Sequence, residues 1–84
     1  MPKTQGVGAI MDILSSIREA CPLLVTRMEA QRITGNLVKS RTLANLDCLG
    51  KGPAVKIKLG RKVAYSRDSF LDWLSKQLRE DTNV

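Results

Sequence analysis

Residues 39–73 read KSRTLANLDCLGKGPAVKIKLGRKVAYSRDSFLDW, and this stretch decides the fold. Its first part, roughly Arg41–Asp47, has the apolar spacing of a short helix, which Ser40 can cap. Gly50-Lys51-Gly52-Pro53 ends that helix, because glycine and proline both disfavour a continuing helix. The sequence therefore predicts a short helix followed by a turn.

A β-hairpin comes next. Apolar residues alternate with lysines over residues 55–59, which predicts a strand with one apolar and one basic face. Gly60-Arg61 supplies the turn, and the returning strand, Lys62–Ser66, carries Val63 and Tyr65 toward the core. We expect a two-stranded hairpin.

A second amphipathic helix closes the stretch. Ser66 can cap this helix, which runs from Arg67 to about Leu78. Trp73 is expected to be the largest core side chain and not a platform on which nucleic-acid bases stack. The broad apolar face consists of Phe70, Leu71, Trp73, Leu74 and Leu78.

An earlier helix is predicted over Ala9–Cys21, after a flexible leader at 1–8, and Pro22 stops it. Its apolar stripe must be covered, and we expect packing on the same chain, with a partner protein as the alternative. The stripe consists of Ile10, Ile13, Leu14, Ile17 and Cys21.

One more helix is predicted over Arg27–Ile33. Thr26 and Glu29 have the spacing of a capping box at its start. Thr34-Gly35-Asn36 ends it, because glycine and asparagine tolerate a left-handed backbone. The expected inward residues are Met28, Ala30 and Ile33, and in the following helix Leu43 and Leu46, with Val38 as an apolar anchor between the two helices.

Two short helices separated by a glycine-containing turn are typical of a helix-turn-helix. With the hairpin as a wing and the last helix closing the core, the expected fold is a mostly helical α+β winged helix-turn-helix domain. The expected division is a leader and amphipathic helix at 1–22, the domain at 23–79, and a flexible tail at 80–84.

Positive charge is concentrated in the middle of the chain. The net charge is +6, yet residues 39–67 carry eight Lys and Arg against Asp47 alone. Such an excess favours a polyanionic partner over a merely soluble basic surface. Aromatic residues are scarce, which disfavours single-stranded nucleic acids read by base stacking. Duplex DNA is the expected partner.

The candidate DNA-binding residues follow from this fold. Arg41 can hold a guanine and Asn45 an adenine, each by two hydrogen bonds. Arg61 suits a narrow minor groove. The competing interpretations are that Ser40 only caps its helix and that lysines only protect a solvated hairpin edge. The predicted set is Lys39, Ser40, Arg41, Thr42 and Asn45 on the helix, Lys56, Lys58, Arg61 and Lys62 on the wing, and Lys51 and Arg67 as additional phosphate contacts.

Other classes of protein are disfavoured. There is no His to act as a general base, no nucleophile motif and no phosphate-binding glycine loop. We expect no catalytic site, metal, cofactor or small-molecule substrate. Spacing alone does not pair Cys21 with Cys48, and we expect two reduced, mostly buried thiols. With no apolar run of membrane length and no signal peptide, the expected location is cytoplasmic, at the nucleoid.

The chain resembles the excisionase-like branch of the MerR-type winged helix domains over Leu23–Gln77. The similar motifs are SRTL in the reading helix, the LGKGP turn, the K-x-G-R-K-V-x-Y wing and the D-x-F-L-x-W-L closing helix. The chain departs from the family in a longer turn at Thr34–Val38 and in having Leu46 where an aromatic residue is common.

The resemblance implies a non-enzymatic protein that binds beside an attachment site, bends DNA and biases a tyrosine-family integrase toward excision. It implies DNA contacts by Ser40, Arg41, Thr42 and Asn45 in the helix and by Arg61 and Lys62 in the wing, with several copies bound together. A small transcriptional regulator is the alternative function. An adaptor that binds an acidic protein is a third.

Overall fold

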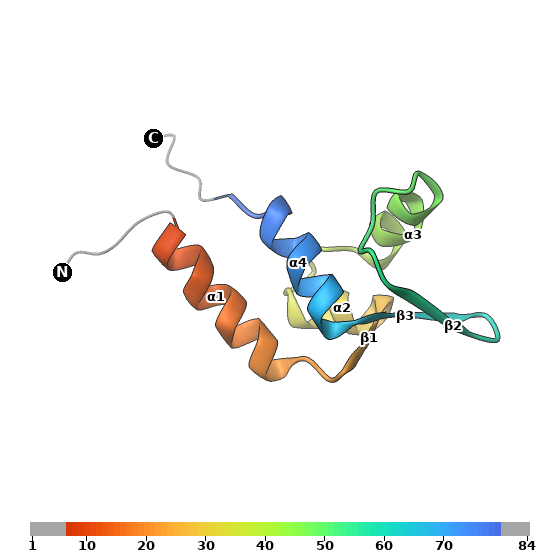
Figure 1. Cartoon of the computed structure of the whole chain (residues 1–84), viewed down its shortest axis with the longest axis horizontal. Coiled ribbons are helices and arrows are strands. Elements are labelled where there is room, and N and C mark those ends of the chain that lie inside the picture. The colour runs from red at the N-terminus through yellow and green to blue at the C-terminus, as the bar shows by residue number, and fades with distance from the viewer. Residues whose placement is uncertain (1–6, 80–84) are drawn as a thin grey trace.

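The computed structural model describes residues 7–79, in which four helices and three strands form a small α+β fold (Figure 1). The predicted tail at 80–84 and the first six residues of the predicted leader lie outside the described residues. The predicted α+β class is confirmed. In chain order the elements are α1 (Val7–Ala20), β1 (Leu24–Thr26), α2 (Arg27–Ile33), α3 (Ser40–Cys48), β2 (Lys56–Leu59), β3 (Lys62–Ser66) and α4 (Arg67–Gln77).

Helix α1 packs along α4, at the end of the molecule away from the β2–β3 hairpin (Figure 1). It begins at Val7, inside the predicted leader, and ends before Pro22. Leu14 and Ile17 pack against the core, whereas Ile13 remains exposed. The same chain therefore covers part of the apolar stripe of α1, as predicted, and leaves part of it open.

The sheet has three strands and not the two that the sequence predicted. Its order is β1-β3-β2, with both pairs antiparallel. Val25 of β1 lies opposite Tyr65 of β3. Strand β1 has only three residues, so it carries too little alternation to be recognised from the sequence. It forms because β3, far along the chain, offers it a free edge.

The register decides which face of the hairpin meets the core. Residues directly opposite each other in an antiparallel sheet point to the same face. Lys56 is opposite Tyr65 and Lys58 is opposite Val63, so these lysines share the core-facing side of the sheet. The apolar face of β2, with Ile57 and Leu59, lies on the other side and is exposed.

The core lies between the sheet and helices α2, α3 and α4, and α4 supplies the largest part of it. Trp73 is buried there as predicted, stacked on Phe70 with ring centroids 6.2 Å apart. Its indole Nε1 donates to the carbonyl of Lys51 at 2.9 Å. The core residues are Cys21, Val25, Ala30, Val38, Leu43, Tyr65, Phe70, Leu71, Trp73 and Leu74.

Two predictions about burial are wrong. Met28 was expected to point inward, but it is 65% exposed in the first turn of α2. Cys48 is exposed at the end of α3, whereas Cys21 is buried as expected, and burial raises the pKa of the Cys21 thiol. Both thiols are free.

Candidate nucleic-acid interface

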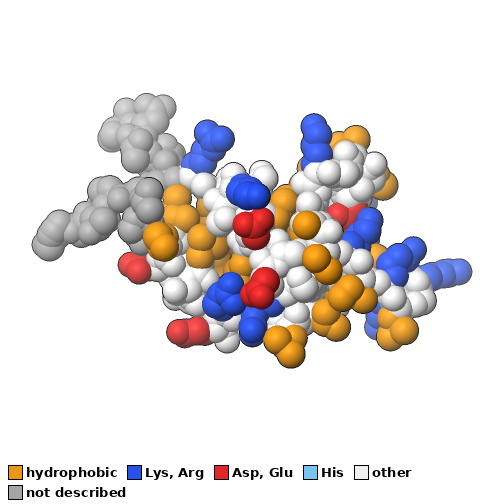
Figure 2. Space-filling model, viewed as in Figure 1, with side chains coloured by type: hydrophobic (Ala, Val, Ile, Leu, Met, Phe, Trp, Pro, Cys, Tyr) orange, Lys and Arg blue, Asp and Glu red, His pale blue; other side chains and the backbone are white. Residues whose placement is uncertain are grey.

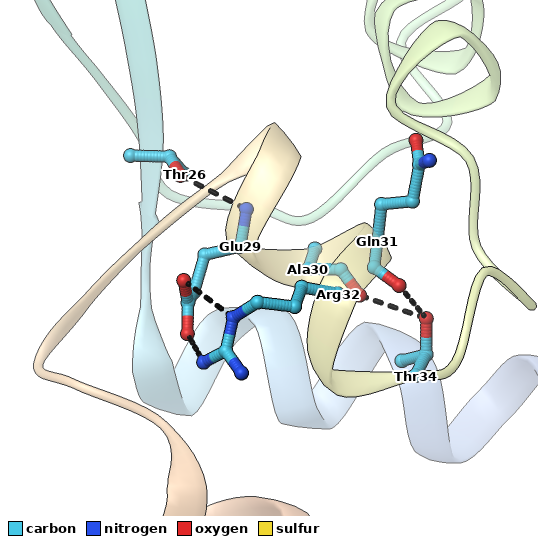
Figure 3. Close-up of polar contacts among 6 residues, drawn as sticks. All are labelled: Thr26, Glu29, Ala30, Gln31, Arg32 and Thr34. Carbon is cyan, nitrogen blue, oxygen red and sulfur yellow. Dashed lines mark hydrogen bonds and ion pairs between the residues drawn. The ribbon is translucent and has the colours of Figure 1, made fainter.

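Side-chain hydrogen bonds order the connection between α2 and α3 (Figure 3). Thr34 Oγ1 donates to the carbonyl of Ala30 at 2.7 Å and accepts from the backbone N–H of Val38 at 3.1 Å. Gly35 and Asn36 have φ values of 62° and 68°, the left-handed backbone that the sequence predicted here. Gln31 Nε2 donates to the Asn36 side chain at 3.2 Å. The long turn is therefore closed by its own polar residues.

The start of α2 is capped as predicted, whereas the predicted cap of α3 is wrong. Thr26 Oγ1 accepts from the backbone N–H of Glu29 at 3.1 Å, and the Glu29 carboxylate pairs with Arg32 (Figure 3). In α3, Lys39 holds the N-cap position and makes no side-chain cap bond. Ser40 lies inside the helix, and its backbone N–H donates to Gln31 Oε1 at 2.9 Å.

The position of Ser40 in α3 bears on the candidate site. Gln31 on α2 binds the first N–H of α3, and Ser40 is not the N-cap because it already lies inside the helix. Ser40 also lines a groove between α2, α3 and the hairpin. Ser40 is therefore available to contact a ligand.

This groove has a volume of about 630 Å³ and brings together residues from β1, α2, α3 and the hairpin. From α3 it takes Ser40 and Arg41, and from the hairpin Arg61 and Lys62. These four belong to the predicted DNA-binding set, and the pair on the helix lies far from the pair on the hairpin in the sequence. The other lining residues are Thr26, Arg27, Met28, Ala44 and Val63.

The remaining predicted residues of the helix lie outside the groove lining. Thr42 and Asn45 are exposed on α3, and Lys39 is exposed just before it. Arg41 and Asn45 are four residues apart and so share one side of the helix. On the opposite side of α3, Leu43 is fully buried and holds the helix in place.

The predicted wing residues occupy a narrow hairpin that extends beyond the rest of the molecule on the side of α3 (Figure 1). Gly60 has a φ of 62°, which fits a two-residue turn with glycine in its first position. Lys56 and Lys58 are exposed on β2, outside the groove lining. In Figure 2, Lys and Arg side chains gather over this end of the molecule.

The two additional predicted phosphate contacts are placed differently. Lys51 is exposed, and its backbone is held by Trp73. Arg67 lies at the start of α4, where its backbone N–H donates to the carbonyl of Leu23 at 2.9 Å. Its side-chain Nε is buried and has no hydrogen-bond partner among the described residues. The structure does not bring Arg67 to the groove.

A polar cluster beneath the groove was not predicted. Asp47 Oδ2 accepts from Arg27 Nη2 and from the Tyr65 hydroxyl, both at 2.6 Å, and Arg27 Nε donates to the Tyr65 oxygen at 3.0 Å. The Asp47 side chain is only 7% exposed and that of Arg27 26%. The cluster therefore joins α2, α3 and β3, three of the elements that line the groove.

Gly52 completes the surroundings of Asp47. A Cβ atom at Gly52 would collide with the Asp47 carboxylate, so the turn after α3 can lie this close to the cluster only with glycine. The one sequence signal for the cluster is that Asp47 is the only acidic residue in the basic stretch 39–67. An acid retained amid so much positive charge is expected to have a fixed basic partner.

The cluster should make the Tyr65 hydroxyl titrate at a higher pH than an ordinary tyrosine. Burial, and next the hydrogen bond to Asp47, raise the pKa of Tyr65 to about 12, from its ordinary value of 10.0. A raised pKa favours the neutral phenol in the folded state, so this stabilisation is present below pH 10 and is lost as the pH rises toward 12. Since Tyr65 is the single tyrosine, tyrosinate absorbance should titrate near pH 12 in the native protein and near 10 in urea. A native midpoint near 10 would contradict the buried placement.

No family model, curated protein or solved structure matches the chain. The excisionase-like resemblance therefore rests on the quoted motifs alone. Among residues 7–79, no helix combines the length and apolar character that crossing a bilayer requires.

Proposed function

We propose that this protein is a winged helix-turn-helix module that binds duplex DNA. The observation that carries the proposal is the groove in which Ser40 and Arg41 of α3 face Arg61 and Lys62 of the hairpin. The major groove of B-DNA admits an α-helix, and a basic hairpin beside that helix can follow the adjacent backbone or minor groove. One duplex would then contact both sides of the protein's groove.

The residues have different roles in this proposal. Arg41 and Asn45, on one side of α3, read base edges, while Ser40, Thr42 and Lys39 hold phosphates. Arg61 enters the minor groove, and Lys56, Lys58, Lys62 and Lys51 neutralise phosphates around it. Arg27 lines the groove, but its guanidinium is bound to Asp47 and Tyr65. We therefore assign Arg27 to positioning the elements.

Within this class, the motif resemblance favours an excisionase. Such a protein binds duplex DNA beside an attachment site, bends it and biases a tyrosine-family integrase toward excision, with several copies side by side. The same helix and hairpin also suit a small transcriptional regulator on promoter DNA, which is the second candidate. In both cases the protein is not an enzyme and acts at the nucleoid.

Selection of fragmented genomic DNA on the purified protein, followed by sequencing, tests the function. Clustered direct repeats beside an integrase attachment site would support the excisionase. Sites confined to promoters would support the regulator. No enrichment and no affinity for duplex DNA would contradict both and favour an adaptor that binds an acidic protein.

Two alanine variants test the division between base reading and phosphate binding. Arg41→Ala is expected to cost about 1–3 kcal/mol on the preferred sequence and to relax base choice. Lys58→Ala should weaken binding to all sequences equally and reduce the slope of log affinity against log salt by about 1. Fluorescence anisotropy over a salt series measures both effects.

Lys76→Ala is the matched control for loss of one positive charge. Lys76 lies on α4 and is paired with Asp72 at 3.2 Å, away from the groove. Its removal should leave affinity and salt slope unchanged. Equal, sequence-independent losses for Arg41→Ala and Lys58→Ala would contradict α3 as the reading helix.

A further inference from the structure

The apolar face of β2 has no cover. Ile57 is 42% exposed and Leu59 is 83% exposed, the most exposed large hydrophobic residue among those whose side chains the structure describes. Alternation of this kind normally buries one face of a strand. Here the register turns the lysines toward the core side and leaves Ile57 and Leu59 outside. Figure 2 shows hydrophobic side chains exposed across the sheet and out to the hairpin.

Leu59 lies at the tip of the hairpin, directly before the Gly60-Arg61 turn. It is opposite Lys62 in the last cross-strand pair, and Lys62 lines the groove beside Arg61. Leu59 therefore projects from the same narrow end of the molecule as the two cations that are expected to approach DNA.

The surroundings of Leu59 restrict what can cover it. Residues 56–66 contain four basic side chains and no acidic one, so a covering surface must be anionic around a small apolar strip. The minor groove of DNA meets this requirement, because phosphates line both edges and the groove is about 6 Å wide. An uncharged protein surface would leave the neighbouring cations without partners.

We propose that Leu59 is a wedge residue that enters the minor groove beside Arg61 and partly unstacks a base step, which kinks the duplex. The proposal rests on the DNA-binding function proposed above and adds to it the residue that bends the DNA. Leucine is among the apolar side chains that insert between base steps in this way. Flexible T-A steps should be preferred over stiff A-tracts at the hairpin position, since they are easier to unstack.

The test compares Leu59→Thr with Leu24→Thr. Threonine suits a strand, and Leu24 is also an exposed leucine on the same face of the sheet, but on β1, at the opposite edge from β2. The probes are duplexes of about 30 base pairs, end-labelled for energy transfer, with either alternating T-A steps or an A-tract at the centre. Equal melting temperatures of the proteins establish that both variants fold.

We expect Leu59→Thr to lose about tenfold in affinity for the T-A duplex and most of its bend, because the buried apolar surface is lost. The salt slope should stay unchanged, since no charge is removed, whereas Arg61→Ala should lower it by about 1. Leu24→Thr should bind and bend as the unsubstituted protein does.

The outcomes separate this inference from the function on which it rests. No affinity of the unsubstituted protein for either duplex contradicts the proposed function itself. Normal binding and bending by Leu59→Thr, or binding without any bend by the unsubstituted protein, overturns the wedge and leaves DNA binding intact. The wedge is likewise overturned if Leu59→Thr only dissociates a dimer in sedimentation and leaves DNA binding unchanged.

Discussion

Asp47→Ala is expected to lower the free energy of unfolding by about 3 kcal/mol, measured by urea denaturation. The Asp47 carboxylate is almost fully buried and accepts hydrogen bonds from Arg27 and Tyr65. Its removal leaves a partly buried guanidinium without its counter-charge and a buried phenol without its acceptor. The loss falls on α2, α3 and β3 together, so the groove lined by Ser40, Arg41, Arg61 and Lys62 should loosen as well.

Two controls distinguish the buried cluster from ordinary ion pairing. Asp68 pairs with Arg18 at 3.0 Å, but its side chain is 80% exposed, so Asp68→Ala should cost no more than about 1 kcal/mol. Tyr65→Phe removes only the hydroxyl and should cost about 1–2 kcal/mol. A loss for Asp47→Ala no larger than that for Asp68→Ala would show that the cluster does not hold the three elements together.

Trp73→Ala is expected to cost about 3–5 kcal/mol, which is enough to unfold most molecules of so small a domain. Trp73 is buried, stacks on Phe70 and anchors the turn after α3 through the carbonyl of Lys51. The substitution therefore opens a cavity and also frees the turn that carries Gly52. Far-UV circular dichroism follows the unfolding, because the single tryptophan fluorophore is lost.

Trp73→Phe separates packing from hydrogen bonding at this position. An aromatic ring remains beside Phe70, while the Nε1 donor to Lys51 is absent. We expect a loss of about 1–2 kcal/mol, with the fold retained. A Trp73→Ala protein that melts at the temperature of the unsubstituted one would contradict the core position of Trp73.

Local features of the fold were predicted accurately from the sequence. The Thr26 cap of α2, the left-handed turn at Gly35-Asn36, the Ser66 cap and the bounds of α4 all agree with the structure. Each depends on residues within a few positions of one another, where backbone preference and side-chain reach decide the conformation.

The wrong or missing predictions concern contacts between distant residues. Strand β1 requires the edge of β3, and the first N–H of α3 is bound by Gln31 of α2, whereas a local cap by Ser40 was predicted. The exposure of Met28 likewise depends on what α2 packs against and not on helical spacing alone.

In the candidate site, too, local features were predicted and contacts between distant residues were not. The candidate DNA-binding residues were predicted from their charge and their position in the chain. The structure brings Ser40 and Arg41 to one groove with Arg61 and Lys62. Arg67 lies elsewhere, at the start of α4. The cluster that joins the walls of this groove was missed because Arg27, Asp47 and Tyr65 come from three separate elements. Spacing in the sequence carries no signal for such a contact.

By itself, the sequence determined the helices, the hairpin, the caps of α2 and α4, the turns and the concentration of positive charge, because these follow from short-range propensity and from composition. Only the tertiary structure decided which face of the hairpin is covered, which cations share a groove and which carboxylate holds that groove together. Strand register and helix packing decide which of these residues come together. Both depend on the free energy of the whole folded chain and not on any short segment of it. The exposed Leu59 at the hairpin tip is a result of that register.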